Sequence, residues 1–226
     1  MFQKVIFCLL FLFIPLNRAA VNTVANSPFT SSEPVSELAA GEQLFEEMEL
    51  GGTVNFIAFR QAVAGYNRIK EKSKPILTLI DFSKPSTEKR FFVFDMEKKK
   101  LLYSSVVAHG RNSGENYATS FSNQYGSYKS SLGFYLTENT YQGGNGYSLI
   151  LNGLEKGIND KAKARSIVVH GAPYANPSVA ASGRLGRSLG CPALPTKLAR
   201  PIINTIKDGS VMFIYANNPH YLAQSN

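Results

Sequence analysis

From residue 75 onward, the chain consists mainly of short apolar runs that are rich in aromatic and β-branched residues and bounded by turn residues. Runs of this length and composition are typical of β-strands. Pro85 and the turn at 97–100 separate the first three runs, which predicts an antiparallel meander. Short strands with few helices between them predict a mostly β fold with flanking helices, of the α+β class. The predicted strands are residues 76–82, 90–96, 101–108, 132–137, 147–151, 166–170 and 210–215.

Three further segments have helical features. Residues 36–48 are the first, and Gly51 follows its end. The second helix begins at Thr53, which can cap it, and its apolar residues recur at steps of three and four. The third covers 196–207 and precedes the last predicted strand. The glycine-rich segment 143–146 is typical of a tight hairpin turn rather than of a phosphate-binding loop.

The segment 1–25 has the composition of a secretory signal peptide. Lys4 precedes an apolar run at 5–16, which is shorter than the roughly 20 residues that a membrane span needs. An uncleaved anchor is the alternative. Residues 26–52 are then a polar lead-in with a short helix, and 53–226 form the main domain. We therefore expect a periplasmic or secreted bacterial protein, with no stable membrane span after cleavage of the signal.

The formal net charge of +8 falls to +6 when Lys4 and Arg18 leave with the signal peptide, because each carries one positive charge. A basic balance favours anionic partners, such as nucleic acid, a membrane surface or an acidic wall polymer. The basic residues are scattered, so charge alone does not select a partner and we expect no nucleic acid. The run at 98–100 is expected at a solvated hairpin tip. With 44% apolar and 18% charged residues, a disordered polyelectrolyte is excluded.

Residues 112–154 combine many aromatic side chains with Ser, Asn and Gly and with few charges. Rings among neutral polar residues suit a groove for an extended peptide or glycan, because they offer rigid contact area. Alternatively, the rings fill a β core beneath long loops. Both interpretations stay open from the sequence. The rings are Tyr117, Phe121, Tyr125, Tyr128, Phe134, Tyr135, Tyr141 and Tyr147.

Cys191 is the cysteine that remains after signal removal, since Cys8 lies in the apolar run. A lone thiol in an exported protein is free, intermolecular or reactive. Its neighbours Gly190 and Pro192 form a turn that can expose the thiol and aim amide N–H groups at it. His170 ends a predicted strand 21 positions earlier, and a histidine can help to make a cysteine thiolate. A buried cysteine with a structural histidine is the alternative. Export favours a catalytic cysteine, because an unpaired thiol outside the cytosol is a liability unless it takes part in a reaction.

Three more side chains are candidates for the same site. Arg184 and Arg187 can lower the pKa of a nearby thiol or hold a substrate carboxylate. His109 ends another predicted strand and can orient His170, contact substrate or serve the structure. His109, His170 and Cys191 could supply three zinc ligands, the number found in catalytic zinc sites that also bind a water. Short zinc motifs are absent from the sequence, however, and we expect no metal and no cofactor.

Residues 186–194 read Gly-Arg-Ser-Leu-Gly-Cys-Pro-Ala-Leu. With His170 upstream, this segment resembles the histidine, spacer, Ser-His-Gly-Cys signature of L,D-transpeptidases with a YkuD-type catalytic domain. It is more similar to a divergent branch of that family, whose motif is Gly-Arg-Ser-x-Gly-Cys-Pro-Ala-Leu. The resemblance runs from about Phe56 to Tyr215. It implies a β-sandwich-type L,D-transpeptidase catalytic domain over residues 53–226.

The resemblance implies a cofactor-free cysteine acyl transfer on peptidoglycan stem peptides. Cys191 would attack the carbonyl of the third stem residue and release the terminal D-alanine, with His170 as base and then acid. Ser188 and Gly190 would shape the turn and the oxyanion site. An amine acceptor gives a cross-link or a protein attachment, whereas water gives a carboxypeptidase. The residues expected to bind substrate are Arg187, Arg184, His109 and Gly171.

Two positions depart from the commoner signature of the family. Leu189 stands where that signature has histidine, and Ala193 stands where it has arginine. Arg187 can replace that arginine, as the divergent branch suggests. A cell-wall-binding module that has kept the fold but lost turnover is therefore a further alternative.

Overall fold

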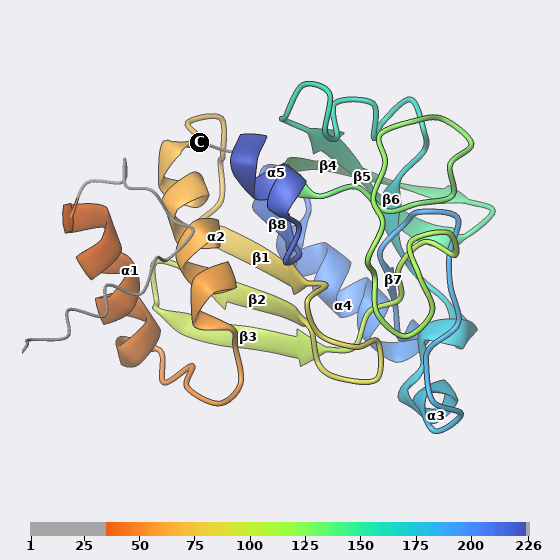
Figure 1. Ribbon diagram of the computed structural model, residues 1–226, viewed down its shortest axis with the longest axis horizontal. Helices are drawn as coiled ribbons and strands as arrows, with labels where there is room; N and C mark the ends of the chain where they lie inside the picture. Colours follow the sequence, from red (N-terminus) through yellow and green to blue (C-terminus); the bar gives the residue numbers. More distant parts are fainter. Residues whose placement is uncertain (1–34, 225–226) are drawn as a thin grey trace, which may run out of the picture. The chain divides into compact units, whose positions relative to one another are not determined.

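A mixed sheet of eight strands lies at the centre of the protein, in the computed structural model that describes residues 35–224 (Figure 1). The strand order is β3-β2-β1-β8-β4-β5-β6-β7. This architecture confirms the mostly β fold with flanking helices. The predicted signal peptide and residues 26–34 of the lead-in lie outside the described residues. The strands are β1 (Ile76–Asp81), β2 (Phe91–Asp95), β3 (Lys100–Ser105), β4 (Gly133–Gly143), β5 (Gly146–Gly153), β6 (Val168–Gly171), β7 (Ala193–Leu194) and β8 (Val211–Tyr215).

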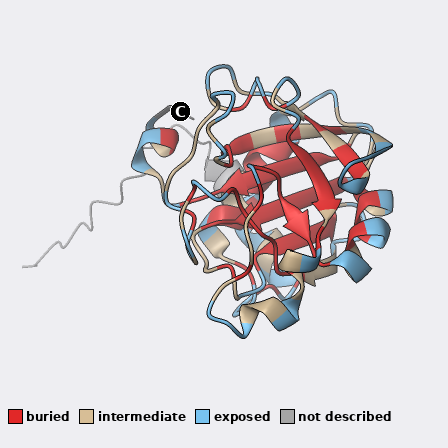
Figure 2. Ribbon diagram, turned by 90° about the vertical axis from the view of Figure 1, so that its right-hand side faces the viewer, coloured by how far each residue is buried: buried red, intermediate tan, exposed pale blue. Residues whose placement is uncertain are grey.

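The first three strands form the predicted antiparallel meander. β8 runs parallel to β1, with Leu79 opposite Phe213. It also pairs antiparallel with β4, and so it joins the two halves of the sheet. Every residue of β1, β2 and β8 is buried, and Figure 2 shows the sheet as the buried centre of the molecule. Strands that are buried along their whole length belong to sheets that are covered on both faces.

Helices pack against this sheet through aromatic and aliphatic side chains. The rings of Phe59 on α2 and Phe94 on β2 pack edge to face, with 5.1 Å between the ring centroids. Phe45 on α1 contacts Phe56 and Phe59, which fixes α1 on α2. α4 lies against β6. The helices are α1 (Val35–Glu47), α2 (Phe56–Arg68), the 3₁₀ helix η1 (Pro173–Ala175), α3 (Pro177–Ala180), α4 (Thr196–Ile206) and α5 (Pro219–Gln224).

The start of α2 differs from the sequence prediction. Asn55 caps this helix, because its Oδ1 accepts the N–H groups of Ile57 and Ala58 at 3.0 and 3.3 Å. Asparagine is among the preferred residues at this position. The prediction that Thr53 is the cap is wrong, since its N–H instead donates to the carbonyl of Leu50 in the turn that follows α1.

The glycine-rich segment 143–146 forms the predicted tight turn, where Gly143 pairs with Gly146 between β4 and β5. The rings of 112–154 divide between the two interpretations. Tyr135 is fully buried and Phe134 stacks on Phe213 at 4.2 Å, so these rings fill the core. Others are exposed at the surface and remain open to a ligand. The exposed rings are Tyr117, Tyr125, Tyr128 and Tyr141.

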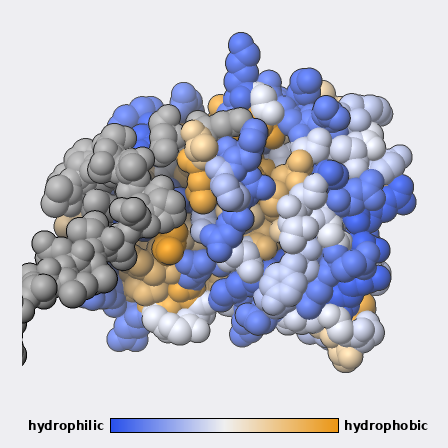
Figure 3. Space-filling view, viewed as in Figure 1, coloured by the Kyte–Doolittle hydropathy of each residue, from blue (hydrophilic) through white to orange (hydrophobic). Residues whose placement is uncertain are grey.

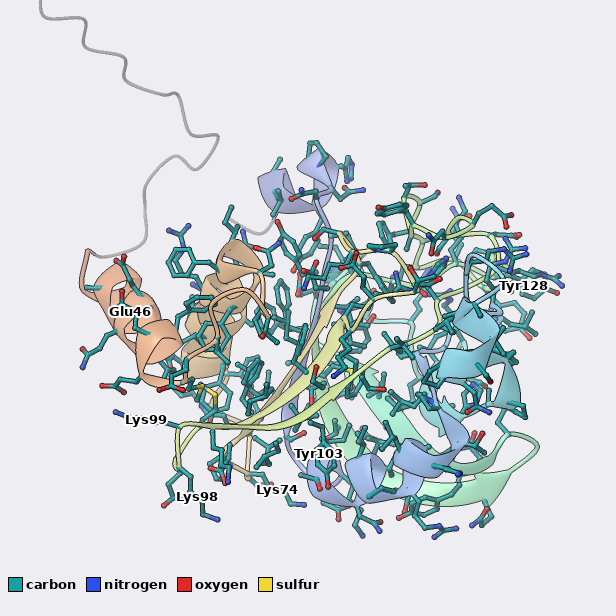
Figure 4. The ribbon with its side chains drawn as sticks, turned by 90° about the horizontal axis from the view of Figure 1, so that it is seen from below. Glu46, Lys74, Lys98, Lys99, Tyr103 and Tyr128 are labelled. Carbon is teal, nitrogen blue, oxygen red and sulfur yellow. The ribbon has the colours of Figure 1, made fainter. Side chains whose placement is uncertain are left out.

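The surface is mixed in polarity. On the face seen in Figure 3, hydrophilic residues predominate and apolar residues show as separate patches among them. Lys98 and Lys99 are exposed at the β2–β3 turn, as predicted for a solvated hairpin tip. Figure 4 places these lysines and Tyr128 at opposite ends of the view. Within residues 35–224, none of the helices combines the length and the apolar character needed to cross a membrane.

Candidate active site

The parallel pairing of β6 with β7 brings His170 and Cys191 onto neighbouring segments. His170 is opposite Ala193 in the register, and its N–H donates to the Pro192 carbonyl at 3.4 Å. Cys191 lies just before β7, where its Sγ accepts the N–H of Val168 at 3.5 Å. The two residues that the sequence singled out are therefore neighbours in the fold, although 21 positions separate them in the chain.

The thiol of Cys191 is buried, with 8% of the residue exposed. The turn therefore does not expose the thiol, although the sequence allowed for this. Its Sγ is 3.6 Å from the carbonyl oxygen of Ser166, which can accept the thiol proton. Burial raises the pKa of the thiol, while the N–H of Val168, the charge of Arg165 and its own backbone act in the opposite direction. The resting group is a protonated thiol at neutral pH.

The imidazole of His170 is oriented by the backbone. Its Nδ1 lies 3.1 Å from the carbonyl oxygen of Gly171. A carbonyl oxygen only accepts, so Nδ1 carries the proton and Nε2 is left as the basic nitrogen. Burial lowers the pKa of His170, which keeps the ring neutral. The hydrogen bonds of Cys191 Sγ within the described residues go to backbone atoms and not to this ring.

Gly171 acts through its backbone in this structure. Besides orienting His170, it allows α4 to pack closely, because a Cβ at Gly171 would lie 2.9 Å from the Cβ of Ala199. Such a separation is too short for two carbon atoms without a shift of the helix.

Ser188 and Gly190 fix the turn that carries Cys191. The hydroxyl of Ser188 donates to the Cys191 carbonyl at 2.6 Å and accepts the Gly190 N–H at 3.1 Å. Gly190 has a φ of +128°, a value that L side chains rarely adopt. A Cβ there would also lie 2.9 Å from the carbonyl oxygen of Lys129. The hydroxyl of Ser130 donates to the Gly190 carbonyl at 3.0 Å, and this bond joins the turn to the loop that precedes β4.

The segment 188–194 is held from its other side by residues 108–111. Ala108 and Ala193 exchange backbone hydrogen bonds, and Gly110 forms a parallel bridge with Ser188. The predicted strand at 101–108 ends earlier than expected, since β3 stops at Ser105 and Ala108 joins this bridge instead. Backbone contacts on both sides therefore fix the position of Cys191.

Arg184 and Arg187 form ion pairs with Glu115. The nitrogen–oxygen distances are 2.9 Å for Arg184 and 2.6 Å for Arg187. Arg187 also donates to the carbonyls of Arg111 and Gly114. Their charges are thus balanced by a carboxylate, and neither contributes to the pKa of Cys191. Of the two roles that the sequence leaves open for these arginines, the field at the thiol comes instead from Arg165, and binding of a substrate carboxylate stays a prediction.

Arg165 was not singled out by the sequence. It lies among the basic residues Lys161 and Lys163, a pattern that normally marks a solvated surface. In the structure its guanidinium is partly buried against the loop that precedes β4. The sequence contains no local signal for this burial, since the loop that covers the side chain is distant in the chain.

His109 has structural contacts at both ring nitrogens. Its Nδ1 is 2.7 Å from Nη2 of Arg90, which only donates, so Nδ1 accepts and Nε2 carries the proton. Nε2 lies 3.3 Å from the Gly114 carbonyl. Burial and the charge of Arg90 lower the pKa of His109 to about 4. The ring therefore holds the loop after β3 and does not contact His170 by a hydrogen bond, and its nitrogens are not free to bind zinc.

Tyr174 in η1 is a further side chain near the thiol. Burial raises its pKa to about 12, and a charge on Cys191 acts in the same direction. The phenol is therefore protonated at neutral pH and can donate a hydrogen bond. Among the described residues, no group of three or more His, Cys, Asp and Glu side chains has an arrangement that could hold a metal ion.

Comparison with known proteins identifies similar chains. A family model described as the L,D-transpeptidase catalytic domain matches residues 51–215. L,D-transpeptidase 3 from Mycobacterium tuberculosis is 14% identical, with a TM-score of 0.40 and coverage of 62% of this chain and 61% of that chain. An L,D-transpeptidase from Stackebrandtia nassauensis is 14% identical, with a TM-score of 0.38 and coverage of 83% and 81%. One from Mycobacterium smegmatis is 13% identical, with a TM-score of 0.38 and coverage of 63% and 59%.

The chain spans about three fifths of the length of the mycobacterial structures. The search of curated proteins found no match.

Proposed function

The chain belongs to the L,D-transpeptidase catalytic domain family, and from this membership we propose that it is an exported cysteine acyltransferase acting on peptidoglycan stem peptides. The observation that carries the proposal is the position of Cys191. It lies in a turn fixed by Ser188 and Gly190, next to the strand of His170. A nucleophile beside a base, on a rigid backbone, is the arrangement that acyl transfer requires.

In the first step, His170 takes the proton of the Cys191 thiol at Nε2. Sγ then attacks the carbonyl carbon of the third stem residue, so that a C–S bond forms and the C–N bond to the terminal D-alanine breaks. The leaving nitrogen receives the proton from His170 and departs as an amine. The product of this step is a thioester between Cys191 and the shortened stem.

In the second step, an acceptor amine attacks the thioester and its proton passes through His170 to the departing Sγ. The N–H of Cys191 is the donor that we assign to the oxyanion region. Arg187 and Arg184 are assigned to the substrate side, where exchange of Glu115 for a substrate carboxylate keeps both charges paired.

Water as the acceptor makes the same chain an L,D-carboxypeptidase. A specific observation favours a second candidate, a wall-binding module without turnover. The thiol is buried and hydrogen-bonded to the backbone of Ser166 and Val168 rather than to His170. Leu189, in the position of a family histidine, is 57% exposed and offers an apolar contact instead of a polar one.

The experiment is mass spectrometry of tetrapeptide muropeptides incubated with the protein, with Cys191→Ala in parallel. Cross-linked dimers that require the cysteine support the transpeptidase, and stems shortened by one residue support the carboxypeptidase. Unchanged muropeptides that still co-sediment with the folded protein identify the binding module. Localisation is tested separately by fractionation of the bacterial envelope, where a protein confined to the cytoplasm contradicts export.

A further inference from the structure

Arg165 lies directly behind the turn that carries Cys191. A Cβ at Gly190 would be 3.6 Å from Nη2 of Arg165, so the guanidinium is in contact distance of the residue that precedes the cysteine. The next residue, Ser166, supplies the carbonyl that faces Sγ at 3.6 Å. Two consecutive residues therefore present a cation and a hydrogen-bond acceptor to the same turn.

The guanidinium is held in place by oxygen atoms that carry no net charge. Nη1 donates to the Ser122 carbonyl at 2.7 Å and to Ser131 Oγ at 2.6 Å. Nη2 donates to the Lys129 carbonyl at 2.7 Å and to Ser127 Oγ at 3.2 Å. These contacts give the charge a fixed position, because a planar fork bonded on both sides has few other orientations.

No carboxylate neutralises this charge within the described part of the chain. The ion pairs there involve Arg184 and Arg187 with Glu115, and the lysines with other acids, but not Arg165. A partly buried cation without a counter-charge favours a negative charge nearby, since screening by water is reduced. Two groups that can become negative interact with Arg165, the phenol of Tyr135 and the thiol of Cys191, and of these the thiol lies in the turn.

We propose that Arg165 is a positioning residue that stabilises the thiolate form of Cys191 and anchors the turn in which this thiolate forms. The inference rests on the proposed function only in treating the thiolate as the nucleophile. The carbonyl of Ser166 stabilises the protonated thiol, whereas Arg165 and the Val168 N–H stabilise the thiolate. Proton removal therefore ends the bond to the Ser166 carbonyl and strengthens the interactions with the Val168 N–H and with Arg165.

A separate observation agrees with this assignment. Arg165 is the charged side chain that acts on the Cys191 pKa, and it lowers that pKa against the larger effect of burial. The conformation of Ser166 fits the same picture, because its φ of +57° is rare for a non-glycine residue. Such backbone strain is found where the surrounding structure requires a particular carbonyl direction.

The test is the pH profile of Cys191 alkylation by iodoacetamide in the full chain, resolved by peptide mass spectrometry so that Cys8 does not contribute. We expect Arg165→Gln to move the midpoint to higher pH and to slow alkylation at pH 7 by about three- to tenfold. Arg165→Lys keeps the charge and is expected to keep the midpoint near that of the unmodified chain. Lys163→Gln removes an equal charge from the ion pair with Glu138, and its midpoint is expected not to move.

A second variant tests the charge without removing the arginine. Ser127→Asp places a carboxylate beside Nη2 and is expected to raise the midpoint, whereas Ser127→Asn is not. Equal midpoints in the Gln, Lys and unmodified chains, or equal shifts in the Gln and Lys variants, would overturn the inference. A shifted midpoint in a chain that leaves muropeptides unchanged refutes the proposed function alone. Cross-linking with an unshifted midpoint refutes the inference alone.

Discussion

The hydroxyl of Ser188 donates a hydrogen bond to the carbonyl of Cys191 within the same turn, with 2.6 Å between the two oxygens. The same hydroxyl accepts the N–H of Gly190, so one small side chain satisfies two backbone groups of the turn. Because the hydroxyl both donates and accepts, it holds the peptide that precedes Gly190 and the peptide that follows Cys191. The direction of the Cys191 side chain thus depends on a residue three positions earlier.

Replacement of this hydroxyl is the first prediction. Ser188→Ala leaves a buried N–H and a buried carbonyl without their partner, which should cost about 1–3 kcal/mol of unfolding free energy. Acyl transfer should fall further than stability, because the turn no longer fixes Cys191. Urea unfolding and muropeptide turnover measure the two effects. The control is Ser182→Ala, whose hydroxyl bonds one exposed carbonyl at 2.7 Å. Equal effects at both serines would contradict the assigned role.

The second prediction concerns the glycine of the same turn. Gly190→Ala combines a φ of +128° with contacts at 2.8 Å to Ile167 Cδ1 and 2.9 Å to the Lys129 carbonyl. We expect a loss of at least about 2 kcal/mol of unfolding free energy. Gly144→Ala is the matched control, since nothing lies within 4 Å of its Cβ position. Denaturant unfolding of the two variants tests this prediction. Similar unfolding midpoints for Gly190→Ala and Gly144→Ala would show that the turn accepts a side chain.

The third prediction is the acidic limb of the acyl-transfer pH profile. Burial lowers the pKa of His170, so the neutral ring that accepts a proton persists to lower pH than an exposed histidine would. An ordinary histidine has a pKa of about 6.5, and activity should therefore decline only at a pH below that value. The dependence of kcat/KM on pH measures this limb. His170→Gln should remove turnover altogether, and an acidic limb above the usual range would contradict the assignment of His170 as the base.

The fourth prediction links His109 to stability in acid. Its pKa is lowered to about 4 in the folded protein from an ordinary value of 6.5, so the unfolded chain binds the extra proton first as the pH falls. Stability from this group is therefore complete above pH 6.5 and is lost as the pH falls toward 4. The loss is on the order of 3 kcal/mol.

The measurement is urea unfolding of the protein and of His109→Gln between pH 7 and pH 4. The glutamine amide can accept from Arg90 and donate to Gly114 without titrating. The two proteins should differ in the slope of unfolding free energy against pH, with the histidine protein losing more stability in acid. Parallel slopes would mean that His109 is not the group responsible.

Helices and strands whose apolar residues recur in a regular local pattern can be predicted from the sequence. Features that depend on contacts with distant segments of the chain cannot. The long strands and α4 follow from local composition, and residues 186–194 point to the candidate site because their motif is contiguous. β7 could not be predicted, since its two residues are strand only through pairing with β6 and Ala108. Arg165 is a comparable case, because its burial depends on a loop more than thirty residues earlier.

The position of β8 in the sheet has a consequence for biosynthesis. It is the last of the described strands, and among them it alone pairs the β1–β3 half with the half that carries Cys191. A nascent chain is made from its N-terminus, so this central strand leaves the ribosome after the other described strands. The two halves of the sheet cannot join before that moment. The β1–β3 meander can pair within itself before then, but the complete sheet requires β8 to pair with both halves.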